Sequence, residues 1–464
     1  MNRKLTGTAF IAVAIAVLFT GAKMRSVRSP SAPKPVVLIG TRSFEITDKP
    51  IVAAFTLDRV MTQLAARSGV AGLTGPQLLR QMFDTQNRQP GLADPAGPHC
   101  DDTLVAGAPT FNGFPRRCPT PEGRLAATPY LGDEYFALGI ANRFDLAPAD
   151  GTNCGQYRIA FARREPSPLT RIHLIFEAVL PNPNPSAGLT GCRAVAQFWA
   201  DLSAVDSMDE RRARLETFFF DGLPGFAPVV DPPNFAQPGG IRTFHQTLPS
   251  PGNRFYQFRL QKQCGGGDCT LRMVPDVLEN MPWSELFDAN ATDTPLGRAF
   301  RDEFVKQLPT LAIPDLTGFH LDLPTQYLMV ESNPTDAFVA FNYETPFNRA
   351  LSTSKGAGFR DRIVAELARI GSTMTTEQVF VRTFHETCVG CHGLNGATNF
   401  GDGLTLVIGF QGISMLSEDI LMDGEAGPQT RYGVDPIVEK QFVPVRMQVL
   451  QDFLSGKAPP AHSK

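Results

Sequence analysis

The chain has little tryptophan, histidine and cysteine: only 2 Trp, 7 His and 8 Cys occur among its 464 residues. It shows no internal repeat and no phosphate loop, dinucleotide fingerprint or nucleophile elbow. The net charge of −3 gives no basis for binding nucleic acid. These absences argue against repeat proteins and common nucleotide-binding and hydrolase classes. The placement of the few cysteines and histidines is therefore the most informative feature.

The overall composition is that of an ordinary globular protein, with 42% hydrophobic and 19% charged residues. The 39 prolines and 41 glycines predict many turns and irregular connections. A chain of 464 residues exceeds one simple core, so two or three domains are expected.

The N-terminus has the pattern of an export signal. Arg3 and Lys4 precede an apolar run over residues 5–21, and small residues allow cleavage after Ala22. Basic residues follow directly, so an uncleaved membrane anchor is the alternative. A proline- and serine-rich tether is expected over residues 23–35. Both alternatives place the body of the protein outside the cytoplasm, in the periplasm or secreted, with membrane attachment only if the segment is uncleaved.

Residues 36–350 carry both helix and strand patterns. Pro76 at an early helical position and Ser207 three residues before Glu210 are helix-start signals. Strand patterns alternate apolar and polar residues. Helix patterns cover residues 57–68, 75–86, 192–205, 207–222 and 293–308, and strand patterns cover 157–163, 171–180, 254–261, 269–274 and 337–346.

The partial segregation of these patterns predicts an α+β region with a mixed, largely antiparallel sheet. No convergent His/Asp/Glu set is evident in it, so we expect it to recognise a partner or ligand without chemistry of its own. A helix over residues 351–371 is expected to connect it to a separate all-α domain over 372–456, followed by a tail over 457–464.

Six cysteines lie before residue 300, an even number that suits disulfides in an exported protein. Six cysteines allow fifteen pairings, so connectivity does not follow from sequence. The pairing that we prefer is local, because each cysteine has a near neighbour in the chain. It joins Cys100 with Cys118, Cys154 with Cys192, and Cys264 with Cys269.

The remaining two cysteines stand in "FHETCVGCHGLNG", residues 384–396. Cys388, Cys391 and His392 form a C-x-x-C-H motif, which is typical of covalent haem attachment. Half of a zinc site and a redox dithiol are the alternatives. A zinc site needs a second ligand pair, and none follows in the sequence. A redox dithiol usually lies in a thioredoxin-like βαβ unit, and no such pattern surrounds the motif.

Helix geometry explains why these residues suit a haem. Thr375 and Gln378 have the spacing of a capping box that starts a helix. If that helix continues, Cys388, Cys391 and His392 lie at i, i+3 and i+4 on one face. Each thiol can then add to one haem vinyl group, and the imidazole can ligate the iron from the same side.

On this motif, roughly the last 90 residues resemble a c-type cytochrome domain. The resemblance implies thioether bonds at Cys388 and Cys391 and a proximal ligand at His392. It also implies a helix before the motif, a methionine-bearing loop, and a last helix packed against the first. Met422 lies where the distal ligand is expected, with Met415 and Met447 as alternatives.

The function expected from the sequence is one-electron transfer through a single covalent haem c. The partner would be a redox protein or a small-molecule electron donor or acceptor, which the sequence does not identify. One alternative is a haem-dependent oxidoreductase or sensor with an open distal iron site. Another is a surface binding protein in which the haem domain is accessory.

Overall fold

The computed structural model forms one compact unit from Val36 to Lys464. The expected signal peptide and tether, the strand pattern over 337–346 and Met415 lie outside the residues that it describes. The described residues are 37–164, 171–245, 254–289, 293–316, 318–332, 354–393, 398–406, 420–424 and 427–457.

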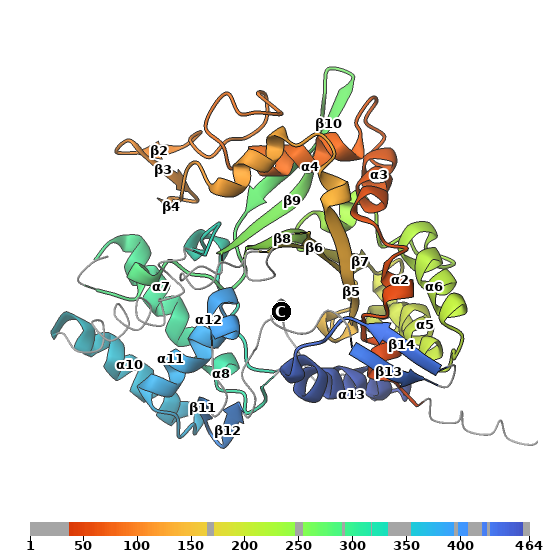
Figure 1. Cartoon of the computed structure of the whole chain (residues 1–464). Helices are drawn as coiled ribbons and strands as arrows, with labels where there is room; N and C mark the ends of the chain where they lie inside the picture. Colours follow the sequence, from red (N-terminus) through yellow and green to blue (C-terminus); the bar gives the residue numbers. More distant parts are fainter. Residues whose placement is uncertain are drawn as a thin grey trace, which may run out of the picture. The chain divides into compact units, whose positions relative to one another are not determined.

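The centre of the fold is a seven-stranded antiparallel sheet with the order β1-β5-β6-β7-β8-β9-β10 (Figure 1). Every paired neighbour in it is antiparallel, because consecutive strands are joined as hairpins or by returning connections. The strands are β1 (Glu45–Ile46), β5 (Tyr135–Arg143), β6 (Asn153–Arg163), β7 (Ile172–Pro181), β8 (Gly240–His245), β9 (Arg254–Gly265) and β10 (Asp268–Asp276).

Strand β7 shows how the sequence makes a sheet with two different faces. Leu174 and Phe176 are fully buried on the first face. The alternate positions Ile175 and Glu177 lie on the second face, because successive side chains of a strand point to opposite sides. The first face is therefore an apolar core surface, whereas the second combines apolar and charged side chains.

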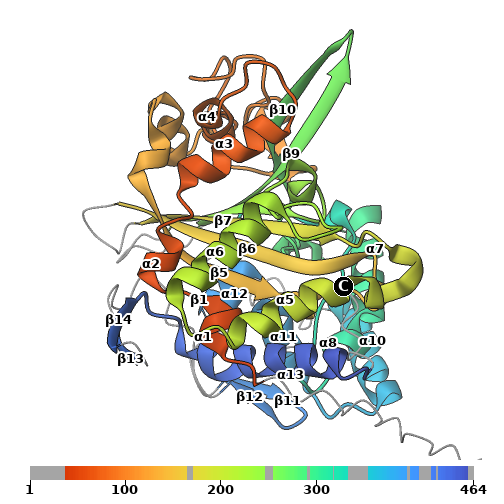
Figure 2. The same ribbon diagram turned by 90° about the vertical axis from the view of Figure 1, so that its right-hand side faces the viewer.

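The first hydrophobic core lies between the first face and a layer of helices, of which α5 and α6 cross the sheet in Figure 2. Sequence-encoded caps start several of these helices: the Thr56 side chain accepts from Arg59 N, and Thr74 and Gln77 form a capping box. The helices of this part are α1 (Gly40–Ser43), α2 (Lys49–Val52), α3 (Leu57–Arg67), α4 (Gly75–Asp84), α5 (Arg193–Ser203) and α6 (Met208–Glu216).

A second hydrophobic core covers one end of the second face, where Phe244 and Phe255 belong to it. Arg382 ties this core together although its side chain is fully buried. Its guanidinium donates to the carbonyls of Leu311, Ile313, Phe400 and Gly401 at 2.8–3.1 Å. The helices here are α7 (Pro295–Lys306), α8 (Leu308–Leu311), α10 (Ser354–Ile370), α11 (Thr376–His385) and α12 (Cys388–Gly393).

The fold class expected from the sequence is wrong for the C-terminal residues, which do not form an all-α domain. They contain the hairpins β11–β12 (Thr398–Gly401, Leu404–Leu406) and β13–β14 (Ile420–Gly424, Gly427–Arg431). In β11–β12, Asp402 and Gly403 have φ of 49° and 77°, the left-handed pair that favours a tight hairpin turn. Phe400 and Leu406 enter the second core.

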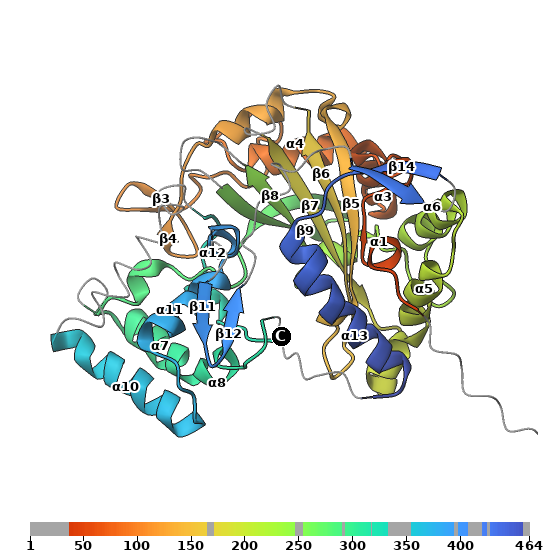
Figure 3. The ribbon, with the colours of Figure 1, turned by 60° about the horizontal axis from the view of Figure 1, so that its bottom comes forward.

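The last helix, α13 (Val443–Leu454), also departs from the cytochrome pattern. It packs against α5 and α1, and the rings of Phe453 and Phe144 are 5.0 Å apart. Val443 and Leu450 belong to the first core, whereas Val379 and Phe384 of α11 belong to the second. The apolar stripe of α13 therefore completes the core of the large sheet. In Figure 3, α13 lies along the β5 side and α12 on the β8 side.

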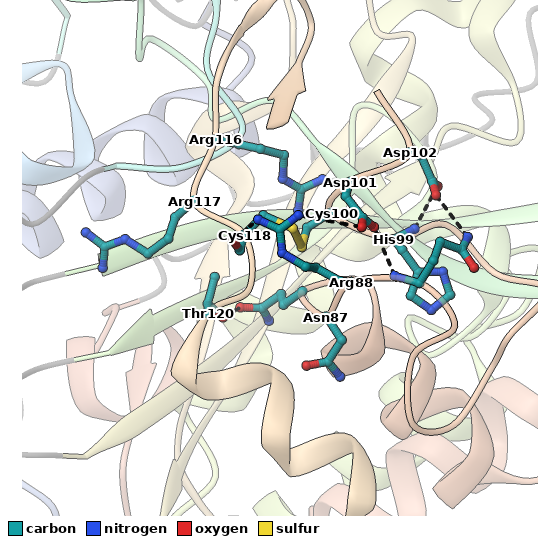
Figure 4. Close-up of a disulfide and its surroundings, with 12 residues drawn as sticks. Asn87, Arg88, His99, Cys100, Asp101, Asp102, Arg116, Arg117, Cys118 and Thr120 are labelled. Atoms are coloured by element: carbon teal, nitrogen blue, oxygen red, sulfur yellow. Dashed lines mark hydrogen bonds and ion pairs between the residues drawn. A yellow bond between two sulfur atoms is a disulfide. The ribbon is translucent and has the colours of Figure 1, made fainter. Parts of the chain in front are cut away.

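Three disulfides join the sequence-local cysteine pairs Cys100–Cys118, Cys154–Cys192 and Cys264–Cys269. Around the first pair, Asp102 accepts a hydrogen bond from His99 N at 2.7 Å (Figure 4). Three disulfides indicate an oxidising compartment. Among the described residues, no helix is both long and apolar enough to cross a membrane.

Candidate functional site

The C-x-x-C-H motif forms its own short helix, α12, and does not continue α11 as expected. The predicted capping box of α11 is confirmed at Thr375 and Gln378. After α11, Thr387 starts α12, because its Oγ1 accepts from Gly390 N at 3.0 Å and donates to Phe384 O at 2.7 Å. A Cβ at Gly390 would lie 1.6 Å from Phe384 O, so the middle of the motif requires glycine.

Cys388 and Cys391 are the two cysteines that remain free thiols, and all eight cysteines lie in the described residues. Each is half-buried. Burial raises the pKa of the Cys388 thiol, and burial together with nearby Glu386 raises the pKa of Cys391 to about 12. Both thiols are therefore protonated at neutral pH, although part of their surface stays accessible.

Glu386, just before the motif, is a second group whose charge is suppressed. Burial raises its pKa to about 8, so the carboxyl is mainly protonated at neutral pH. Asn280 Nδ2 donates to Glu386 Oε2 at 3.2 Å, which ties α12 to the segment after β10. The helix also contacts β9. These contacts place the motif at the β8–β9 side of the sheet.

The second face of the sheet presents charged residues toward the motif. Glu177 on β7 joins Arg158 on β6 to Arg242 on β8, with one carboxylate oxygen 3.2 Å from each guanidinium. Burial alone would lower the pKa of Arg242, but Glu177 and both motif cysteines raise it above its usual range. Arg242 lies on β8, the neighbour of β9, which α12 contacts.

The charged residues continue toward α13. Arg143, at the end of β5, makes a forked ion pair with Asp145 at 2.9–3.1 Å. Arg446 on α13 pairs with Glu45 on β1. We call the four guanidinium groups of Arg143, Arg158, Arg242 and Arg446 the arginine row. The row faces the carboxylates of Glu45, Asp145 and Glu177, and Glu279 also acts on Arg242.

Apolar side chains lie beside the arginine row on the central strands. Ala160 on β6 pairs in register with Ile175 on β7, and Ile175 pairs with Arg242 on β8. All three residues are half-buried, as is Val179 further along β7. A half-buried surface of small and branched apolar residues, bordered by arginines, is suited to a flat apolar molecule that carries anionic groups.

The other residues that the sequence predicts near the motif lie in several different parts of the fold. His392 occupies the i+4 position of α12 relative to Cys388, as the motif requires. Met422 lies in β13, in register with Gln429. Met447 packs with the first core, as a structural methionine does. His385 is buried between the rings of Phe319 and Phe400, and burial lowers its pKa to about 4.

The alternatives to haem attachment at the motif are a redox dithiol and half of a zinc site. A nucleophilic dithiol needs a cysteine with a lowered pKa, whereas burial raises the pKa of both motif thiols here. The residues that the structure describes contain no group of three or more His, Cys, Asp or Glu side chains arranged for a metal ion. Two protonated, half-buried thiols one helical turn apart are suited to covalent modification by a ligand that lies against them.

No family model, curated protein or solved structure matches this chain significantly.

Sequence reasoning missed the arginine row. A single charged residue in a strand pattern, such as Arg158 or Glu177, is ordinarily read as a solvent-facing position. The signal in the sequence is a charged residue among the apolar residues of each of three strands, namely Arg158, Glu177 and Arg242. Its meaning depends on the register that brings Arg158 opposite Glu177.

Proposed function

We propose that this protein is an exported c-type haem protein, periplasmic or secreted, that transfers single electrons through one covalent haem. One observation carries the proposal. Cys388 and Cys391 are the two cysteines left unpaired, and they lie one helical turn apart beside a half-buried apolar and cationic surface. The resemblance to c-type cytochromes is limited to the motif, because the surrounding fold differs.

The residues present fit such a group. Cys388 and Cys391 would carry the thioether bonds and His392 would be the proximal iron ligand. Ala160 and Ile175 would provide an apolar surface against the ring. Haem bound there would supply an iron that cycles between the ferrous and ferric states. The electron donor or acceptor would be a redox protein or a small molecule that reaches this iron.

The direct test is a pyridine haemochrome assay on the exported full chain. We expect one haem per chain, retained after acid–acetone extraction because thioether bonds hold it. We also expect a reduced-minus-oxidised spectrum of the c type. Haem that extracts freely, or no haem at all in a host that matures other c-type cytochromes, would contradict the proposal.

A second candidate function, ligand binding at an open iron, is favoured by the position of the hairpin that contains Met422. The base of this hairpin is fixed at the β1 edge, where Tyr432 N donates to Thr47 O at 3.0 Å. The motif helix contacts β9. These strands are five steps apart in the sheet, about 24 Å at ordinary strand spacing. The backbone of Met422 is thus held on the far side from the motif.

Carbon monoxide separates the two candidates. If the iron is open, the reduced wild-type protein should bind carbon monoxide, and Met422→Ala should leave both the binding and the midpoint potential unchanged. Absorbance titration and potentiometry measure these two quantities. A wild type that excludes carbon monoxide, together with a Met422→Ala variant that admits it at a lower midpoint potential, would assign Met422 as the distal ligand.

A further inference from the structure

We propose that Arg158 and Arg446 bind the two propionate groups of the haem attached at the C-x-x-C-H motif. The inference rests on the proposed function. It assigns to the large sheet, which has no counterpart in small cytochromes, a direct part in holding the cofactor.

The order of the strands indicates on which side of the site the propionates would lie. Arg242, on β8, is the member of the arginine row on the strand next to β9, which the motif helix contacts. Haem carries its propionates on the edge opposite the vinyl groups that the thiols attack. The propionates must therefore lie away from β8. Arg158 on β6 is two strand steps from β8, about 10 Å, and β5 is three steps away, about 15 Å.

The positions of the four members along the surface indicate which two could face the propionates. Arg143 already directs its fork at Asp145, through contacts of 2.9–3.1 Å from Nε and Nη2. Arg242 lies at the thiol end. Arg158 keeps 26% of its side chain exposed; its Nη2 lies 3.2 Å from Glu177 Oε1, and its Nε donates to Gln156 Oε1 at 2.6 Å. Arg446 reaches the same surface from α13.

Electrostatics favour an anion at this position. Burial, with a smaller effect from the other three members of the row, lowers the pKa of Arg158 to about 10 against the opposing effect of Glu177. Burial and Arg143 likewise lower the pKa of Arg446. Neighbouring guanidinium groups thus disfavour the charged forms of Arg158 and Arg446, and an added carboxylate would offset this repulsion. Forked hydrogen bonds from arginine to a carboxylate are the geometry that this side chain prefers.

The test compares Arg158→Gln and Arg446→Gln with the wild-type holoprotein. We expect covalent haem to remain at one per chain in both variants. The propionate bending band in the resonance Raman spectrum should shift in each, because it reports hydrogen bonds to the propionates. The midpoint potential should fall, because loss of a nearby positive charge favours the more positive ferric haem. Arg158→Lys should restore most of the potential while the Raman band stays altered.

Arg211→Gln is the matched control. Arg211 is a buried arginine on α6 that is ion-paired with Asp48 at 3.4 Å, away from the row. It should leave the Raman band and the potential unchanged. If the wild type holds no covalent haem, the proposed function itself fails. If haem is present but neither Arg158→Gln nor Arg158→Lys moves the propionate band, the assignment of the propionates alone is overturned.

A dissolved carboxylate could bind the arginine row through the same hydrogen bonds as a haem propionate. Titration with succinate distinguishes these two ligands. When propionates fill the row, succinate should leave the spectrum of the wild-type holoprotein unchanged. Saturable binding of succinate that Arg158→Gln abolishes, with the propionate band unmoved, would instead show a site for a dissolved carboxylate.

Discussion

Replacing Cys388 and Cys391 together by serine should abolish covalent haem, from one group per chain to none. Serine has nearly the shape of cysteine but no thiol to add to a vinyl group, so only attachment is removed. Each single variant should retain haem through one thioether, with the haemochrome absorption shifted toward longer wavelength by the remaining vinyl group. The pyridine haemochrome assay on denatured, extracted protein measures both results.

The matched control removes cysteines elsewhere. Cys264 and Cys269 close a hairpin tip at the β9–β10 turn, far along the strands from the motif (Figure 1). Their double serine variant should keep its haem. His392→Ala should keep both thioethers but change the iron spectrum, because only the proximal ligand is lost. Haem that survives in the Cys388→Ser, Cys391→Ser variant would show attachment at another position.

Removing the Cys154–Cys192 disulfide should destabilise the protein by about 4 kcal/mol, on the chain-entropy relation for a loop of 38 residues. Both cysteines are fully buried in the first core, and Arg193, which begins α5, directly follows Cys192. The bond thus fixes α5 against β6. Guanidinium unfolding of Cys154→Ala, Cys192→Ala measures the change through the transition midpoint at a constant m-value.

The Cys264–Cys269 pair again provides the comparison. It closes only 5 residues, and Cys264 is exposed, so its loss should cost about 2 kcal/mol. Equal losses from the two disulfides would contradict the dependence on loop length and on burial. A smaller loss at Cys154–Cys192 would show that core packing alone positions α5.

Much of the local structure could be predicted from the sequence, because its determinants are local. The helix that starts at Leu57 follows from the Thr56 cap and the spacing of apolar residues. The capping box at Thr375 and Gln378 likewise determines where α11 begins. The C-x-x-C-H motif is also local, since its cysteines lie within one helical turn.

The predictions were wrong or incomplete where a segment packs against a distant part of the chain, or where a hairpin turn was not identified. The pair Asp402-Gly403 in "GDGLT" forms a hairpin turn, so the domain that was expected to be all-α contains strands at this point. The last helix that the resemblance implies is present as α13, yet the sequence alone does not specify which core its apolar face joins. The arginine row depends on cross-strand register, which is encoded by the packing of the whole sheet.

The long-range contacts of α13 also bear on biogenesis. The helix is made last, yet Arg446 pairs with Glu45, 401 residues earlier, and Tyr432 O accepts from Thr47 Oγ1 across 385 residues. The first core therefore stays incomplete until the motif has been synthesised and exported. Contacts of such separation form late in folding because the entropic cost of closing the loop is large. On the proposed function, the attachment machinery would meet the motif on a chain that is still open, and the arrival of α13 would close the fold behind the bound cofactor.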